Sequence, residues 1–331
     1  MSFLDQSQIN RFNSEGYLVV ENAFDPKVVL DPLIEEYKGV LDSLANELYV
    51  KKLIKSKYSD YDFSERLTRI CEESGKIHAQ YFDFSLPQNG IKKDTPMWHG
   101  PAVFRVLSNK YILDIVEDII GSEIYSNPIQ HVRLKPPESR TPVYAGTKTV
   151  QLGATPWHQD NGVANEDADM TNMLTVWIPI WDASVEDGCL HVVPSSHIEG
   201  LKTHCPQSDR KDARGGFGLH IPDKLFRKND AIPLPMKRGS VLLLHKMTCH
   251  GSLPNKSNRI RWSLDLRYNP IGEPTGRNTF PGFIARSKKN PNSELHDPIV
   301  WAESWLKARH DLSIAEEQTY NRWSTEHPAC A

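Results

Sequence analysis

The chain lacks several features that would assign it to a specialised class of protein. It has no apolar run of about 18 residues, the length that indicates a membrane-spanning helix. Its opening residues, MSFLDQSQINRFNSEG, contain neither the basic segment nor the apolar segment of a secretory signal. The formal net charge is −3 and the lysines and arginines are scattered, so no basic surface for nucleic acid is indicated. We therefore expect a cytoplasmic protein that binds neither membranes nor nucleic acids.

Cysteine is also scarce. Five cysteines are widely spaced and form no CxxC pair; they are Cys71, Cys189, Cys205, Cys249 and Cys330. Such a pattern predicts neither a disulfide framework nor a zinc ribbon. We expect all five thiols to be reduced, as is usual in a cytoplasm.

What the chain does contain is enough apolar material for a large core, with 39% hydrophobic residues in 331. Apolar residues at helical spacing predict helices over 25–44, 62–82, 108–121 and 298–318. Between 123 and 270 the pattern changes to short strands separated by proline, glycine and asparagine, which favours a sandwich or barrel. We predict a single domain over 1–331: a mainly helical buttress with the first strand in 1–122, a β core in 123–270 and a C-terminal extension in 271–331.

A histidine and an aspartate stand two residues apart in PWHQDNGVANEDADM, at 156–170. On a strand, His158 and Asp160 would point to the same face while Gln159 points away. His250, at the end of the apolar run SVLLLHKMTCH, supplies a second imidazole. Two histidines and one carboxylate leave three of six octahedral positions open, as ferrous iron requires, whereas zinc prefers a nearly closed tetrahedron. His245 is the rival ligand, but its odd separation from His250 predicts the opposite face.

Taken alone, an HxD pair is a weak signal, but the chain resembles the phytanoyl-CoA dioxygenase (PhyH) family of Fe(II)/2-oxoglutarate oxygenases in three ordered motifs. These motifs are His158-Gln159-Asp160, DGCLHVVPSSH at 187–197 and HGSLPNKSNRIRWSLDLRY at 250–268. The resemblance extends to the opening INRFNSEGYLVVENAF. It implies an all-β core with flanking helices, a double-stranded β-helix of the jelly-roll, cupin-like type. It also implies that His158, Asp160 and His250 bind Fe(II), with 2-oxoglutarate and O₂ as cosubstrates.

The same resemblance assigns cosubstrate contacts. It implies that Arg261 binds the far carboxylate of 2-oxoglutarate with help from Ser252, since a guanidinium can hold a carboxylate through two parallel hydrogen bonds. Arg259 and Arg267 share the strand face of Arg261 and are alternatives from the pattern alone. Gln130 and Trp177 resemble a cosubstrate-directed glutamine and a pocket-wall tryptophan, although a glutamine that satisfies backbone groups and a core tryptophan are the structural alternatives.

The reaction implied is hydroxylation of an unactivated C–H bond in a small-molecule substrate, with epimerisation, desaturation or ring closure as alternative outcomes. Three acidic residues, Glu166, Asp167 and Asp169, follow the ligands on an expected loop at the barrel mouth, where they would attract a cation or simply face water. Arg133 and Lys135 would meet an anionic group, and Arg267 is a further candidate substrate contact.

These charges favour a polar or zwitterionic metabolite, for example a guanidine alkaloid of the cylindrospermopsin type made in secondary metabolism. Two other classes compete with an oxygenase. One is a noncatalytic jelly-roll protein that binds a metal or ligand, and the other is a zinc hydrolase, for which no general base is evident. No pattern in the chain predicts the oligomeric state.

Overall fold

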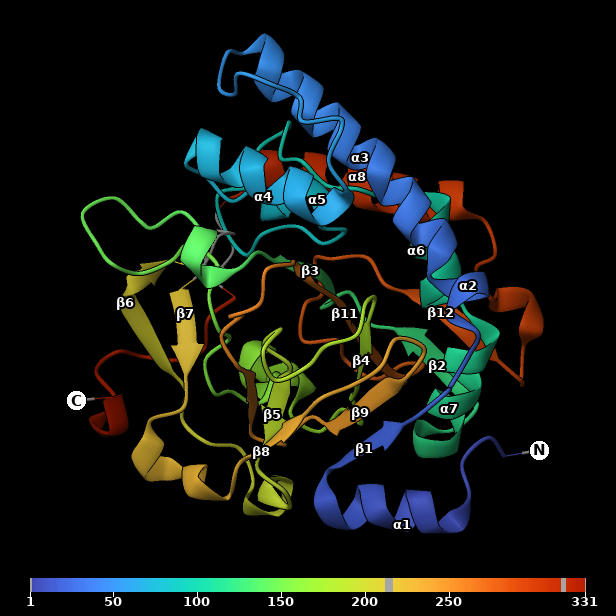
Figure 1. Cartoon of the computed structure of the whole chain (residues 1–331). Helices are drawn as coiled ribbons and strands as arrows, with labels where there is room; N and C mark the ends of the chain where they lie inside the picture. The colour runs from blue at the N-terminus through green and yellow to red at the C-terminus, as the bar shows by residue number, and fades with distance from the viewer. Residues whose placement is uncertain (1, 212–216, 317–319, 331) are drawn as a thin grey trace.

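The computed structural model describes residues 2–211, 217–316 and 320–330 (Figure 1). The helices are α1 (Gln6–Glu15), α2 (Pro26–Val29), α3 (Asp31–Val50), α4 (Phe63–Ser74), α5 (Ala79–Phe82), α6 (Pro101–Leu107), α7 (Lys110–Ile120) and α8 (Pro298–Ile314). The strands are β1 (Tyr17–Val20), β2 (Glu123–Ser126), β3 (His131–Lys135), β4 (Leu174–Pro179), β5 (Leu190–Val192), β6 (Cys205–Lys211), β7 (Phe217–His220), β8 (Ile232–Leu234), β9 (Val241–His245), β10 (His250–Ser252), β11 (Arg261–Pro270) and β12 (Phe283–Ser287). All four predicted helical stretches contain helices, while α1 and α6 were not predicted.

Helix α7 illustrates why the periodicity predicted helices correctly. Asn109 precedes the helix and its side-chain oxygen accepts a hydrogen bond from the backbone N–H of Tyr111 at 3.0 Å. Gly121 ends the helix with a positive φ of 90°, a conformation that glycine adopts without strain. The residues buried between these ends, Ile112, Leu113, Ile115 and Val116, form one apolar face. That face packs the helix against the sheet.

Two facing antiparallel sheets form the core, as expected for a jelly roll. The larger sheet has the strand order β1-β9-β4-β11-β2-β12, with β3 also paired to β11, and the smaller has the order β10-β5-β8. A separate hairpin is formed by β6 and β7. Strand β1 lies in 1–122, where a first strand was predicted, and β12 lies in the segment predicted as a C-terminal extension.

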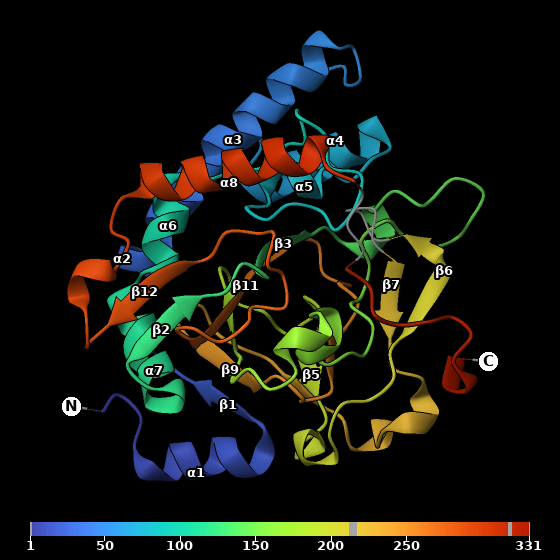
Figure 2. The ribbon, with the colours of Figure 1, turned by 180° about the vertical axis from the view of Figure 1, so that it is seen from behind.

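Side chains alternate across β11, and this alternation separates the helical layer from the site. Trp262, Leu264, Leu266 and Tyr268 are buried in the cluster shared with the helices. Helices α3, α4 and α8 lie together on that side in both ribbon views (Figures 1 and 2). The indole of Trp262 stacks on the ring of Phe63 from α4, with centroids 4.7 Å apart. Replacing Trp262 by alanine would therefore lower the free energy of unfolding by about 3–5 kcal/mol. The alternate residues of β11 therefore project toward the smaller sheet.

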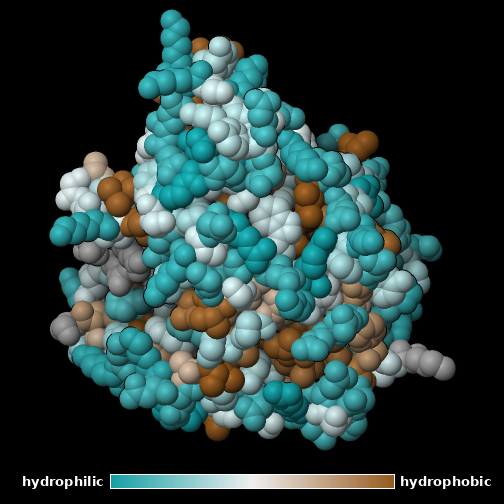
Figure 3. Space-filling view, viewed as in Figure 1, coloured by the Kyte–Doolittle hydropathy of each residue, from teal (hydrophilic) through white to brown (hydrophobic). Residues whose placement is uncertain are grey.

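None of the described helices is long and apolar enough to cross a bilayer. On the face shown in Figure 3, hydrophilic side chains predominate and the hydrophobic ones form small, separate patches.

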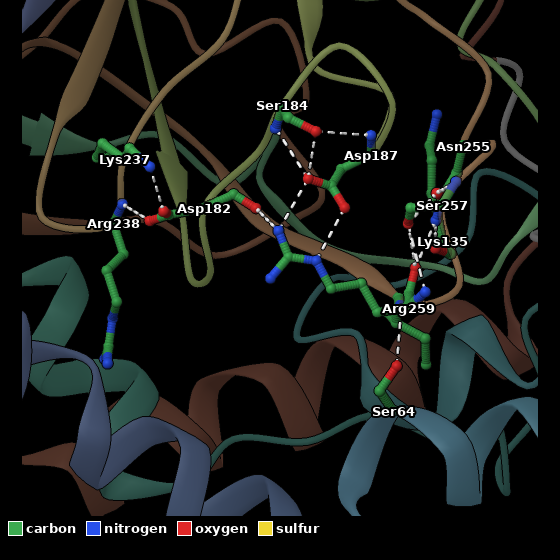
Figure 4. Close-up of polar contacts among 11 residues, drawn as sticks. Ser64, Lys135, Asp182, Ser184, Asp187, Lys237, Arg238, Asn255, Ser257 and Arg259 are labelled. Carbon is green, nitrogen blue, oxygen red and sulfur yellow. Dashed lines mark hydrogen bonds and ion pairs between the residues drawn. The ribbon is translucent and has the colours of Figure 1, made fainter.

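A polar network holds the start of β11 in place (Figure 4). The Arg259 guanidinium donates two hydrogen bonds of 2.8 Å to the carboxylate of Asp187. The side-chain amide of Asn255 donates to the backbone oxygens of Lys135 at 2.9 Å and Arg259 at 2.8 Å. On α4, the Ser64 hydroxyl accepts a hydrogen bond of 2.7 Å from the backbone N–H of Ile260, the residue before β11. Arg259 is therefore paired with Asp187. Asn255 links the end of β3 to the residues before β11.

One expectation about cysteine was wrong, because Cys205 and Cys330 form a disulfide. Cys71, Cys189 and Cys249 are free and buried, as expected. The pairing was not predictable from spacing, since the two residues are 125 positions apart and meet only where the C-terminal segment returns to β6. In both ribbon views this end of the chain lies beside the β6–β7 hairpin (Figures 1 and 2).

Candidate metal centre

His158 and Asp160 do not lie on a regular strand, although they are brought together as expected. His158 forms a single antiparallel bridge with His250, in which the backbone N–H of each donates to the oxygen of the other at 2.8 and 2.9 Å. The chain then turns into a short 3-10 helix, η2 (Asp160–Val163). The apolar strand before His250 ends at His245, and His250 begins the separate strand β10. The Gln159 amide points away from the pair and donates to the backbone oxygen of Met247 at 2.6 Å.

The three predicted ligands converge. One ligand atom from each of His158, Asp160 and His250 lies within 4.8 Å of the others. The Nε2 atoms of His158 and His250 lie 3.9 and 3.8 Å from the Asp160 carboxylate oxygens. The Nδ1 of His158 lies 2.9 Å from the backbone oxygen of Pro156, and the Nδ1 of His250 lies 2.9 Å from that of Thr248. Because a carbonyl only accepts, Nδ1 carries the proton and Nε2 keeps its lone pair for a metal.

The protonation states suit metal binding. Burial lowers the pKa of His158 to about 3, so its imidazole is neutral near pH 7. Burial raises the pKa of Asp160, but the positive charge of Arg267 opposes this effect, and the pKa lies below its ordinary value. Asp160 is therefore ionised, and the set of two imidazoles and one carboxylate fits a divalent transition metal.

Arg267 and Thr175 orient the Asp160 carboxylate from adjacent strands. The Nη2 of Arg267 donates to Oδ1, and the Thr175 hydroxyl donates to Oδ2 at 2.5 Å. The register of β4 and β11 places Thr175 and Arg267 directly opposite each other. The Nη1 of Arg267 donates to the backbone oxygen of Ile129 at 2.5 Å. Arg267, predicted as a substrate contact, thus holds a metal ligand, and Thr175 was missed because the register cannot be read from the sequence.

Lys135 and Arg261 form a pair of buried cations, directly opposite each other on β3 and β11. The Lys135 ammonium donates to the hydroxyls of Thr155 at 2.5 Å and Ser252 at 3.0 Å. Among the described residues, the Arg261 guanidinium donates to the Ser263 hydroxyl at 3.1 Å, and its Nε has no hydrogen-bond partner there. Neither residue has an ion pair with a carboxylate in the described part of the chain.

The pKa values of Lys135 and Arg261 show that burial disfavours their charged forms. Burial and the charge of Arg261 lower the pKa of Lys135 well below its ordinary value, and burial lowers the pKa of Arg261 to about 10. Burying unpaired cations is unfavourable. Such a pair is a candidate binding site for an anion, and Lys135, predicted as a substrate contact, lies there beside Ser252 and opposite Arg261.

The two remaining predicted cosubstrate contacts are buried and incompletely hydrogen-bonded. The Arg261 guanidinium carbon lies 5.7 Å from the centre of the Trp177 ring, whose Nε1 has no hydrogen-bond partner in the described part of the chain. The Gln130 side-chain amide donates to the Ser126 hydroxyl at 3.2 Å, while its Oε1 has no partner among the residues that the structure describes. Unsatisfied buried groups of this kind are rare and often mark a ligand site.

A cavity of about 170 Å³ is lined by one candidate ligand and by one residue of this cation pair. His158, Arg267 and Lys135 all contribute to its lining. The apolar part includes Ile129, Val163 and Leu219. Further polar lining comes from Asp83, His131 and Arg133, of which Arg133 donates to Asp265 at 2.8 Å. The same cavity therefore borders His158 of the candidate metal site and Lys135 of the candidate anion site.

The structure does not bring the three acidic residues to this lining. Glu166 and Asp167 are exposed, and Asp167 accepts a hydrogen bond from Asn278 at 2.9 Å. Asp169 is paired with Arg322 of the C-terminal segment at 2.6 Å. These residues follow the ligands closely in sequence, but η2 directs them away from the cavity.

The rival histidine is also outside the site. His245 Nδ1 accepts a hydrogen bond from the backbone N–H of Met247 at 3.1 Å, and its ring lies 5.0 Å from that of His197. It does not belong to the group of three ligands. His191 stacks on Trp157, with ring centres 3.8 Å apart, so both histidines near the ligands have packing roles.

The fold is a jelly roll that carries a candidate metal site, and the comparisons with known proteins identify the family. The family model for phytanoyl-CoA dioxygenase (PhyH) matches residues 12–263. The chain belongs to the phytanoyl-CoA dioxygenase family, as the sequence motifs predicted.

Relatives cover most of the chain. A phytanoyl-CoA dioxygenase of Arabidopsis thaliana is 24% identical over 268 residues, which are 80% of this chain and 88% of the relative. The 1-deoxypentalenic acid 11-beta-hydroxylase of Streptomyces arenae is 27% identical over 292 residues, 86% of this chain and 88% of the relative. A solved structure of the non-heme monooxygenase ThoJ in its apo form covers 93% of this chain and 98% of that chain, with a TM-score of 0.51 at 16% identity. That likeness confirms the fold.

Proposed function

We propose that the protein is an Fe(II)- and 2-oxoglutarate-dependent oxygenase that hydroxylates an unactivated C–H bond of a small polar metabolite. The observation that carries the proposal is the convergence of three candidate ligands in a molecule that also buries two cations, with His158 of the ligands and Lys135 of the cations lining one cavity. A noncatalytic protein would not need both sites. A zinc hydrolase would use the ligands but leave Lys135 and Arg261 without a partner.

The donor set fits iron with room for cosubstrates, because one carboxylate and two imidazoles occupy only part of an octahedron. When bound, iron with 2-oxoglutarate and O₂ supplies the oxidation of the substrate C–H bond, while 2-oxoglutarate is converted to succinate and CO₂. The protein then has to orient its cosubstrate and substrate and exclude water.

Each of these tasks falls to residues of this chain. Arg261 and Lys135 hold the far carboxylate of 2-oxoglutarate, with the Ser252 hydroxyl beside them. Trp177 covers the Arg261 guanidinium and keeps water from it. Arg267 and Thr175 keep Asp160 ionised and fixed. The substrate occupies the part of the cavity that passes His158.

The cavity lining supports a small substrate with polar groups. Arg133, His131 and Asp83 would hydrogen-bond its charged or polar substituents, and Ile129, Val163 and Leu219 would contact its carbon skeleton. A guanidine alkaloid of the cylindrospermopsin type remains a member of this class, recognised by the cavity rather than by the acidic residues. The hydroxylase of Streptomyces arenae is named for an acid, which supports testing carboxylates as well.

The decisive experiment adds Fe(II) and then 2-oxoglutarate to the purified protein without oxygen, followed by O₂. We expect a charge-transfer absorption band that requires both additions, then succinate formation. The variant R261M is the matched control, because it should bind the metal but form the band only at much higher 2-oxoglutarate concentration. Absence of the band and of succinate, with zinc bound instead, would reject the oxygenase.

Two further measurements identify the substrate and the type of reaction. Small carboxylates, amines and guanidines are screened for faster succinate formation, and the products are analysed by mass spectrometry. Gain of one oxygen atom identifies hydroxylation. Loss of two hydrogens indicates desaturation or ring closure, and an unchanged mass with altered stereochemistry indicates epimerisation.

A further inference from the structure

We propose that the C-terminal residues 320–330, here called the C-terminal strap, position the loop that carries Asp160, and that the Cys205–Cys330 disulfide maintains this position. The inference rests on the proposed function in that it assigns a role at the same metal site. The strap lies beyond residue 263, where the match to the family model ends. It is therefore a feature of this chain outside the matched region.

Trp323 contacts the metal-binding loop directly. Its indole N–H donates to the backbone oxygen of Gly162 at 2.7 Å, two residues after Asp160 in η2. The same indole stacks on the His204 ring, with centres 5.1 Å apart. His204 Nε2 in turn accepts from the backbone N–H of Gln159, the residue before Asp160, at 2.9 Å. One side chain of the strap thus holds the backbone on both sides of the metal ligand.

Arg322 makes a second connection. Its side chain is 8% exposed, and its Nη1 donates to Oδ1 of Asp169 at 2.6 Å. The same carboxylate oxygen accepts from the Asn161 side-chain amide at 2.7 Å, and Asn161 directly follows Asp160. The guanidinium also lies 5.0 Å from the centre of the Trp323 ring. Both strap contacts therefore converge on residues adjacent to Asp160.

The loop has little freedom against this support. A Cβ placed on Gly162 would lie 2.3 Å from the His204 ring, so the backbone of η2 rests directly on the imidazole. A shift of His204 or Trp323 must consequently move η2. Outer contacts of this kind orient metal ligands and commonly change metal affinity when removed.

The strap is fastened at both ends. At its start, the Tyr320 hydroxyl lies 2.6 Å from the Thr279 hydroxyl, and the Arg277 guanidinium lies 4.3 Å from the centre of the Tyr320 ring. At its end, Cys330 is bonded to Cys205, the neighbour of His204 in sequence. The disulfide consequently ties the strap to the segment that supports the loop.

Reduction of the Cys205–Cys330 disulfide would release only the Cys330 end of the C-terminal strap. Two electrons break the S–S bond and two protons complete the thiols of Cys205 and Cys330. With a water-soluble phosphine as reductant, the phosphine supplies the electrons and takes an oxygen atom from water to become a phosphine oxide. The Tyr320 anchor persists, so we expect weaker metal binding rather than its loss.

Metal affinity measured with Co(II) tests the proposal, because Co(II) absorption reports on the ligands without oxygenase turnover. W323F keeps a ring beside His204 but removes the N–H donor, and C330S removes the disulfide. E326Q, at an exposed position of the strap, is the matched control. We expect Co(II) affinity to fall about 10- to 100-fold in W323F, less in C330S and in phosphine-reduced wild type, and not at all in E326Q.

The outcomes separate the possibilities. Unchanged Co(II) affinity in W323F and in reduced wild type overturns the proposal, even if the thermal unfolding midpoint falls, because the strap then only stabilises the fold. If W323F does not fold, the comparison of oxidised and reduced wild type decides in the same way. Wild type that binds Co(II) in a strap-dependent manner but forms no band with Fe(II) and 2-oxoglutarate would reject the proposed function and leave the strap proposal supported.

Discussion

Arg267 and Asp160 form a buried ion pair between residues 107 positions apart, and this pair defines the state of the candidate metal ligand. The two side chains are 5% and 1% exposed. In such an environment an isolated carboxylate would favour its protonated form, which is a poor metal ligand. Arg267 offsets this effect and, together with Thr175, fixes both carboxylate oxygens.

The first prediction concerns Arg267. R267Q removes the positive charge beside Asp160, so we expect Fe(II) affinity to fall about 10- to 100-fold, as measured by anaerobic calorimetric titration. R105Q, which changes an exposed arginine on α6, should have no effect. Equal affinities in the two variants would show that Arg267 does not support the ligand.

The buried cations give a second prediction. Removing one charge-assisted hydrogen bond costs about 1.5–3 kcal/mol, so K135M and R261M should each raise the KM for 2-oxoglutarate roughly 10- to 100-fold. Fe(II) affinity in the absence of 2-oxoglutarate should change little. The measurement is succinate formation across a 2-oxoglutarate series, and an unaltered KM in both variants would contradict the assignment of the anion site.

A third prediction separates the acidic residues. D169N weakens the pair with the nearly buried Arg322, so we expect a loss of about 1 kcal/mol in unfolding free energy, visible as a lower thermal midpoint. E166Q changes an exposed side chain and should leave the midpoint and the substrate KM unchanged. A raised KM for a cationic substrate in E166Q would restore the acidic loop to substrate recognition.

The fourth prediction is a loss of stability in mild acid. Burial lowers the pKa of His99 to about 4, whereas an unfolded histidine titrates near 6.5. Between these values the unfolded chain binds a proton that the folded chain does not, so stability is complete above about pH 6.5 and is lost as pH falls toward 4.

His99 is suited to this test because it stacks on Trp305 in the helical layer. We expect the denaturant midpoint to fall across this window and to fall less steeply in H99Q. The exposed His296 provides the control H296Q, which should retain the wild-type slope. Parallel slopes in wild type and H99Q would mean that other groups account for the acid sensitivity.

Local patterns in the sequence determined much of the architecture. The helices at 25–44 and 108–121 follow from apolar periodicity with capping residues, and these signals act within a few turns of chain. The HxD pair and His250 were identified because their residue types and order are characteristic of one family. The parity argument about His245 and His250 assumed a single strand, whereas His245 ends β9 and His250 begins β10, so separate strands keep His245 out of the ligand group.

Only the tertiary structure determined which polar and charged side chains lie next to each other. The pairing of β3 and β4 with β11 sets Lys135 opposite Arg261 and Thr175 opposite Arg267, and strand register depends on contacts between distant segments. The turn into η2 directed Asp169 to Arg322, and the return of the chain end joined Cys205 to Cys330. The ligand types could therefore be predicted from neighbouring residues, whereas the partners that hold them depend on long-range packing, which no local pattern encodes.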